Sequence, residues 1–166
     1  MDADSYFSQI EFQPRLTPAE MLALGVFDGC YFGGPIPDEF PAEWAEAAVQ
    51  APKPDPLVNV FKVHSGMSLE VWQAKGWIHE DDPLGWFQWY CRYYLGRRHK
   101  DDQRQIKRWV AYSRHRSMLL RHARGSAAKG IVQRQSLLHW AYDPFPDFRT
   151  QWGESVFEKI QRLRPL

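Results

Sequence analysis

Apolar positions recur at helical spacing along most of the chain, and this pattern predicts a mainly helical protein. The clearest local signal is at residues 17–25. Thr17 can cap the first free amides, Pro18 suits the first helical position, and Glu20 completes a capping box. Gly25 is placed to end the helix in a left-handed conformation. We therefore expect a short amphipathic helix here.

Further elements are predicted between the prolines that follow. A second helix begins at Pro41, and Ser68 caps a third. Between them, residues 51–58 form a Pro-rich connection, because three prolines there forbid a helix. Residues 57–63 alternate weakly between apolar and polar, so one short strand or hairpin is the most β structure that we expect.

The most aromatic stretch is predicted to be the central helix of the fold. It covers residues 82–96, with the sequence DPLGWFQWYCRYYLG. Asp82 and Pro83 are typical of a helix start. Apolar residues occupy all of its sides, which indicates a helix surrounded by protein. Gln88 and Arg92 stand four residues apart, so both polar side chains emerge on the same side.

One long helix and two shorter ones are predicted in the C-terminal part of the chain. The long helix covers residues 101–125, the next one residues 131–141, and the last one residues 152–163. In the middle one of these three, we expect Val132 in the core and Arg134 on the outside.

Together these elements predict a mainly α fold. We expect residues 1–166 to form a single compact domain of about six or seven helices around the central aromatic helix, with residues 1–16 as an N-terminal arm. The 44% hydrophobic and 15% aromatic content argues against disorder. The sequence has no apolar run of about 18 residues and begins with an acidic segment, so we expect no membrane span, no secretory signal and a cytoplasmic location.

The net charge of +1 hides a division between two parts of the chain. Residues 1–90 carry 14 acidic and 4 basic side chains, whereas residues 91–166 carry 6 acidic and 17 basic ones. A basic half is typical of a protein with a face for an anionic partner. The alternative is that the two halves pack together and neutralise each other. The isoelectric point of 7.8 is low for a dedicated DNA-binding protein.

Nucleic acid is the anionic partner that the basic residues favour. Basic side chains repeat at helical spacing along residues 101–125, as contacts to phosphates would require. Neighbouring tyrosine and tryptophan rings are suited to stacking on unpaired bases, although tryptophan at helical spacing is more often part of a core. The candidate anion-binding residues are Arg97, Arg98, Arg104, Lys107, Arg108, Arg114, Arg121 and Arg124.

A small-molecule enzyme or ligand-binding protein is the alternative function. Its pocket would lie between the aromatic helix and the glycine-rich aromatic turn at residues 27–34. Arg92 would bind a small anionic ligand, and a tyrosine or histidine would move a proton. Tryptophan, tyrosine and arginine also dominate protein interfaces, so a protein-interaction module is a further alternative. The candidate pocket residues are Gln88, Arg92, Tyr90, Tyr93, Asp82 and Asp143.

The common catalytic and nucleotide-binding signatures do not occur in the sequence. It contains no phosphate-binding Gly-x-x-x-x-Gly-Lys-Ser/Thr motif, no Gly-x-Gly-x-x-Gly motif and no Gly-x-Ser-x-Gly motif. In the run at residues 79–82, His-Glu-Asp-Asp, adjacent side chains point in different directions, so we interpret the acids as a helix start. Cys30 and Cys91 are too few for a four-thiolate zinc site. We expect neither a metal nor a cofactor.

One long motif resembles a family signature. The segment DPLGWFQWYCRYYLGRR, residues 82–98, is similar to the signature of an uncharacterised family of small soluble proteins. The similarity extends over residues 17–142 and includes the Arg-Gln-Ile at 104–106 and the Leu-Leu-His-Trp at 137–140. The resemblance implies a small soluble protein, and it assigns no catalytic residues.

Overall fold

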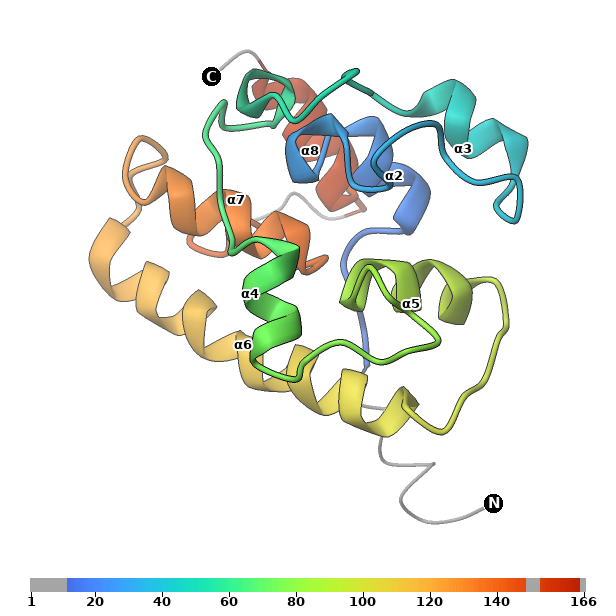
Figure 1. Cartoon of the computed structure of the whole chain (residues 1–166). Coiled ribbons are helices and arrows are strands. Elements are labelled where there is room, and N and C mark those ends of the chain that lie inside the picture. The colour runs from blue at the N-terminus through green and yellow to red at the C-terminus, as the bar shows by residue number, and fades with distance from the viewer. Residues whose placement is uncertain (1–11, 149–152, 165–166) are drawn as a thin grey trace.

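Helices form all of the regular secondary structure in the described part of the chain, residues 12–148 and 153–164 of the computed structural model (Figure 1). The predicted mainly α fold is therefore confirmed. No helix among these residues is long and apolar enough to cross a membrane. The seven α-helices of the described residues are α2 (Pro18–Ala23), α3 (Ala42–Ala47), α4 (Leu69–Ala74), α5 (Trp86–Tyr94), α6 (Asp102–Ala123), α7 (Ile131–His139) and α8 (Val156–Leu163), and their two 3-10 turns are η1 (Phe27–Gly29) and η2 (Pro56–Val58).

The aromatic helix α5 lies at the centre of the fold, between α2 and α6 (Figure 1). The long helix α6 runs along one side with α7 packed against it, and α2, α3 and α8 gather on the opposite side. Six consecutive residues of α5, from 86 to 91, are buried. The Trp89 indole donates to the Asp102 carboxylate at 2.8 Å, and the Tyr90 hydroxyl donates to the Leu16 carbonyl at 2.7 Å. These bonds satisfy the polar tips of two core rings and tie α5 to its neighbours.

Both ends of α2 follow the predicted signals. The Thr17 side chain accepts from the Glu20 amide at 3.1 Å, and the Glu20 carboxylate accepts from the Thr17 amide at 3.4 Å. Gly25, at φ +71°, donates to the Leu22 carbonyl, and the next amide reaches back to Met21, as in a Schellman motif. A Cβ on Gly25 would lie 2.4 Å from the Val58 carbonyl oxygen. The position therefore requires glycine both for its conformation and for its space.

The structure corrects the predicted start of the central helix, whereas residues 57–63 stay within the expected limit of one short strand. Residues 57–63 contain part of the turn η2 and no strand. The central helix begins at Trp86 rather than at Asp82, with Gly85 at φ +101° as its N-cap. Asp82 is instead fully buried, where its carboxylate pairs with arginines. The last helix begins at 156, and the predicted start at residue 152 lies outside the described residues.

Helix α7 buries Leu138, as its apolar spacing predicts, but it differs from the prediction at Val132 and Arg134. Val132 is 46% exposed, whereas Arg134, expected on the outside, is fully buried. The Arg134 guanidinium pairs with Asp147 at 2.9 Å and donates its other bonds to three backbone carbonyls. All five N–H donors are thus satisfied, which makes the burial of this charge tolerable. The expected exposure of Arg134 was wrong because its acceptors come from loops 5 to 13 residues away in sequence.

Candidate functional site

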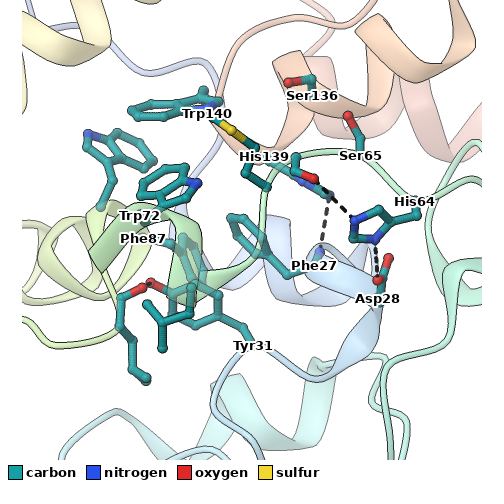
Figure 2. Close-up of a pocket in the computed structure, with 15 residues that line it drawn as sticks. Phe27, Asp28, Tyr31, His64, Ser65, Trp72, Phe87, Ser136, His139 and Trp140 are labelled. Atoms are coloured by element: carbon teal, nitrogen blue, oxygen red, sulfur yellow. Dashed lines mark hydrogen bonds and ion pairs between the residues drawn. The ribbon is translucent and has the colours of Figure 1, made fainter. Parts of the chain in front are cut away.

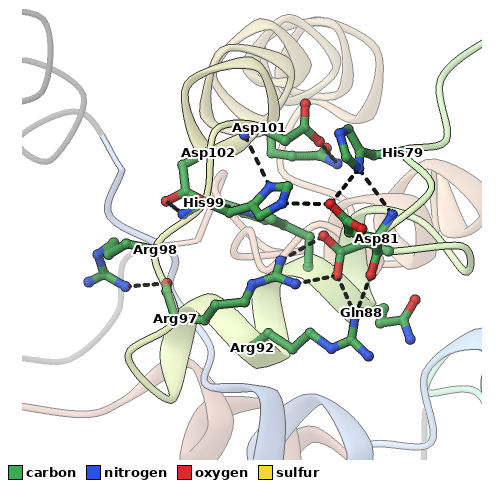
Figure 3. A network of polar contacts seen from close by, with 12 residues as sticks. His79, Asp81, Gln88, Arg92, Arg97, Arg98, His99, Asp101 and Asp102 are labelled. Carbon is green, nitrogen blue, oxygen red and sulfur yellow. Dashed lines mark hydrogen bonds and ion pairs between the residues drawn. The ribbon is translucent and has the colours of Figure 1, made fainter.

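Asp82 neutralises two of the arginines that the sequence marked as functional (Figure 3). Its carboxylate accepts from Arg92 at 2.8 Å and from Arg97 at 2.6 and 2.9 Å. Arg92 also forms two bonds with Glu39, at 2.8 and 2.9 Å, and this partner raises the pKa of the Arg92 guanidinium. Arg97 is therefore not available to an outside phosphate, and its assignment as an anion-binding residue is corrected.

Arg104 and Arg98 are also engaged within the chain. Arg104 donates to both oxygens of the Asp101 carboxylate, at 2.5 and 2.8 Å. Although burial alone would raise it, the pKa of Asp101 is lowered by these bonds. Arg98 lies 3.9 Å from the centre of the Tyr93 ring and donates to two backbone carbonyls. Glu39 and Asp82 of the acidic half thus pair with Arg92 and Arg97, whereas Arg104 and Arg98 find their partners within the basic half.

The six candidate pocket residues do not come together in one cavity. Gln88 is buried and accepts from the Leu84 amide at 2.9 Å. Tyr90 and Tyr93 border an open hollow near the start of the described chain, and Asp143 lies on another side, 3.9 Å from Lys159. Because Asp82 and Arg92 belong to the ion-pair network above, the pocket predicted around Gln88 and Arg92 is not formed.

Helix α6 carries cations that have no acidic partner among the described residues. Lys107, Arg114 and Arg121 are exposed, and no carboxylate of the described residues forms an ion pair with them. They are spaced seven residues apart, so they lie on one face of the helix, about 10 Å from one another. Arg124, just beyond the helix, is likewise exposed. After Asp102, α6 contains no acidic residue at all.

A groove of about 590 Å³ opens beside this row of cations, between α4, α6 and α7. Arg108 stands at its wall, with its guanidinium 5.1 Å from the ring centre of Trp72 and 5.6 Å from that of Trp140. It donates to the Trp77 carbonyl and to the Gln105 side chain, both at 3.1 Å. Burial lowers the pKa of Arg108 to about 10. The aromatic and basic residues that line the groove are Trp72, Trp77, Arg108, Tyr112, Arg114, His115 and Trp140.

A smaller cavity of about 210 Å³ adjoins the groove (Figure 2). The two share the side chains of Trp72, Trp140 and Ser136, among others. The cavity lies between α5 and residues 27–31, the place where the alternative function put a pocket. Figure 2 shows Trp72 and Trp140 at one end and Asp28 with His64 at the other. Its polar lining therefore differs from the one predicted.

Asp28, which is buried, and His64, whose side chain is 62% exposed, form a pair at the end of the cavity opposite Trp72 and Trp140. His64 Nδ1 lies 2.7 Å from the Asp28 carboxylate, which also accepts from Asn59 at 2.6 Å. His64 Nε2 faces the Gly66 carbonyl oxygen at 3.2 Å rather than the cavity. Phe27 and Asp28 both adopt positive φ, at 54° and 58°. Residues other than glycine rarely adopt this backbone conformation, and such strain is often retained at functional sites.

His139 contacts the strained turn at Phe27 and Asp28. Its Nε2 accepts from the Phe27 amide at 3.1 Å and lies 2.8 Å from the Gln135 amide nitrogen. The Phe27 ring stacks on the imidazole, with 4.3 Å between ring centres. Burial lowers the pKa of His139 to about 3. The ring is therefore neutral at physiological pH, with Nε2 as acceptor, and it acts as structural support for the cavity wall.

Two indole N–H groups at the cavity lack acceptors. The Nε1 atoms of Trp72 and Trp86 are buried and have no hydrogen-bond partner among the described residues. Both side chains line the cavity. A buried donor left unsatisfied costs about 1–3 kcal/mol, so each is an unusual feature in a native fold.

A cluster of two histidines and one aspartate lies elsewhere, near the start of α6 (Figure 3). His79, Asp81 and His99 bring ligand atoms within 4.8 Å of one another. However, each imidazole Nδ1 accepts a backbone N–H, from Asp81 or from Asp101, so each Nε2 carries the proton. His99 Nε2 then donates to Asp81 at 2.8 Å, which lowers the pKa of that carboxylate. A metal would have to displace these bonds, so the cluster is organised as a loop-stabilising network.

The residues of the cavity escape prediction because long-range contacts assemble them. Asp28 and His64 are 36 positions apart, and Phe27 and His139 are 112 apart. No local spacing connects them, and only the aromatic turn at 27–34 pointed to this region. Comparison with family models, curated proteins and solved structures finds no match to this chain. The family resemblance therefore stays a prediction, and the site is interpreted from its own geometry.

Proposed function

We propose that the chain binds an anionic partner, single-stranded nucleic acid, in the groove between α4, α6 and α7. The observation that carries the proposal is the position of Arg108. Its guanidinium is half-buried among indole rings and pairs with no described carboxylate, and burial lowers its pKa to about 10. An incoming phosphate would supply the missing counter-charge, and such charge-assisted bonds are among the strongest that arginine makes.

The row of cations on α6 extends this site along the length of a bound nucleic-acid strand. Lys107, Arg114 and Arg121 lie on one helix face and span about 21 Å, which suits contacts to several successive phosphates. Arg114 also lines the groove, so the row and the groove form one surface.

The rings of the groove favour a single strand over a duplex. Trp77, Tyr112 and Trp140 line the groove next to the cations. Unpaired bases can stack on such rings with little sequence preference, whereas bases within a duplex are already stacked and cannot reach them. We therefore expect a preference for single strands that depends on the rings as well as on the charges.

A fluorescence anisotropy titration tests the proposal. A labelled single strand of about ten nucleotides fits the expected site size, and its duplex serves as comparison. With the cations Lys107, Arg108, Arg114 and Arg121 engaged, the logarithm of the binding constant should fall with the logarithm of salt concentration at a slope of about −2.8. Affinity should then be about 50-fold lower at 200 mM than at 50 mM salt. Absent or salt-insensitive binding, or tighter binding of the duplex, would overturn the proposal.

A further inference from the structure

Two tryptophans that line the cavity behind the groove carry indole N–H groups without an acceptor among the described residues. Trp86 is only 2% exposed and Trp72 is partly buried, yet neither indole N–H has a partner among the described residues. An indole N–H can only donate. A ligand that completes this site must therefore carry acceptors, such as ring nitrogens or carbonyl oxygens, close to an apolar ring.

The shape of the cavity fits a flat ring system. Its volume is about 210 Å³, and an apolar cavity of about 150 Å³ is enough to bind benzene. The rings of Phe27, Phe87 and Trp140 form part of the wall. Aromatic walls favour planar ligands that can stack against them or meet their edges. One or two fused rings would fill the space.

Charge orients such a ligand between the cavity and the groove. The Asp28 carboxylate, which pairs with His64, lines one end of the cavity, whereas Arg108 and Arg114 line the adjoining groove. A phosphate is attracted by the two arginines and not by the Asp28 carboxylate. An exocyclic amino group, in contrast, would donate to Asp28. The favoured ligand carries its ring and amino group inward and its negative charge outward.

We infer that this cavity takes one unstacked nucleobase, presented by the strand whose phosphates lie along α6. The inference rests on the proposed function and adds a base-binding pocket to it. The base contributes acceptors to the indole N–H groups of Trp72 and Trp86 and an amino group to Asp28. Stacking within the strand is lost at this nucleotide and is replaced by contacts with the aromatic wall.

Three probes and three variants test the pocket. The probes are a single-stranded deoxyadenosine oligomer, a base-free oligomer of the same length, and adenosine. Leu69→Trp fills the cavity from a partly exposed position, Trp72→Phe removes one indole donor but keeps a ring, and Trp44→Phe makes the same change outside the cavity. Binding is measured by calorimetry, and circular dichroism and thermal melting check that each variant is folded.

The pocket predicts a distinct pattern of losses. Leu69→Trp should weaken the binding of adenosine and of the deoxyadenosine oligomer about tenfold or more, and Trp72→Phe about fivefold, as loss of one buried hydrogen bond implies. Trp44→Phe should change neither, and the base-free oligomer should bind all variants within about twofold of the wild type.

Each contrary outcome separates the pocket from the proposed function. Equal binding of both oligomers, or unchanged binding to Leu69→Trp, would overturn the pocket, while salt-dependent binding of the base-free oligomer would still support the proposed function. If adenosine binds, Leu69→Trp blocks this binding and neither oligomer binds, the base pocket is supported. The proposal that a single strand supplies the base is then overturned. If no probe binds, both proposals fail.

Discussion

The guanidinium of Arg108 lies 5.1 Å from the ring centre of Trp72, and within the described residues it forms no ion pair. This relationship joins the two parts of the site. Arg108 belongs to the helix that carries the free cations, and Trp72 lines both the groove and the cavity behind it. A cation over an aromatic face is attracted to it, but a half-buried charge still benefits from an anion.

The buried His139 predicts a loss of stability in mild acid. Burial lowers its pKa to about 3, whereas the unfolded chain titrates near 6.5, so below pH 6.5 the unfolded state binds more protons. Its contribution to the free energy of unfolding should therefore fall by about 2 kcal/mol between pH 7.5 and pH 5. Urea unfolding of the wild type and of His139→Gln at both pH values measures this contribution. An equal pH dependence in the two proteins would contradict the assignment of a neutral buried imidazole.

The buried Arg134–Asp147 pair should be important for stability. Both side chains are almost fully buried, at 0% and 5% exposure. Asp147→Ala leaves the guanidinium without its counter-charge and should lower the free energy of unfolding by about 3–5 kcal/mol. The pair between Arg162, which is 55% exposed, and Glu154 is the control, and Arg162→Gln should cost at most about 1 kcal/mol. Similar losses in the two variants, measured by urea unfolding, would show that burial does not decide the value of these pairs.

Asp82 should stabilise the fold through its charge. Its fully buried carboxylate accepts from Arg92 and Arg97, and Asn keeps the size but removes the counter-charge. Because water reaches part of both guanidinium groups, we expect Asp82→Asn to cost about 2–3 kcal/mol, less than a fully buried pair. The neighbouring exposed Asp81→Asn is the comparison in thermal and urea unfolding. If Asp82→Asn is no more damaging than Asp81→Asn, the network of Figure 3 is not held by this charge.

The helices could be predicted because their signals are local. The capping box at Thr17 and the glycine at position 25 lie within a few residues of the amides and carbonyls that they satisfy. The aromatic helix was recognisable because apolar residues on all its sides require surrounding protein. Its start was placed four residues early, because Asp82 has the chemistry of a cap but bonds to distant arginines instead.

The fate of each charge could not be predicted from the sequence. Arg97 and Arg114 belong to the same basic half, yet the first meets a buried carboxylate and the second meets none within the described residues. That difference depends on which acidic loop packs against which helix. The cavity could not be predicted for the same reason, because Asp28, His64 and His139 come from three distant segments.

The salt dependence of single-strand binding by Arg108→Gln tests the central claim most directly. Glutamine keeps a donor for the Trp77 carbonyl and removes the charge. The slope of the logarithm of the binding constant against that of salt should change from about −2.8 to about −2.1, because one phosphate contact is lost. Lys53→Gln, a change of an exposed cation in the Pro-rich connection, should leave the slope at the wild-type value. Equal slopes for wild type and Arg108→Gln would contradict the claim that Arg108 receives the anion.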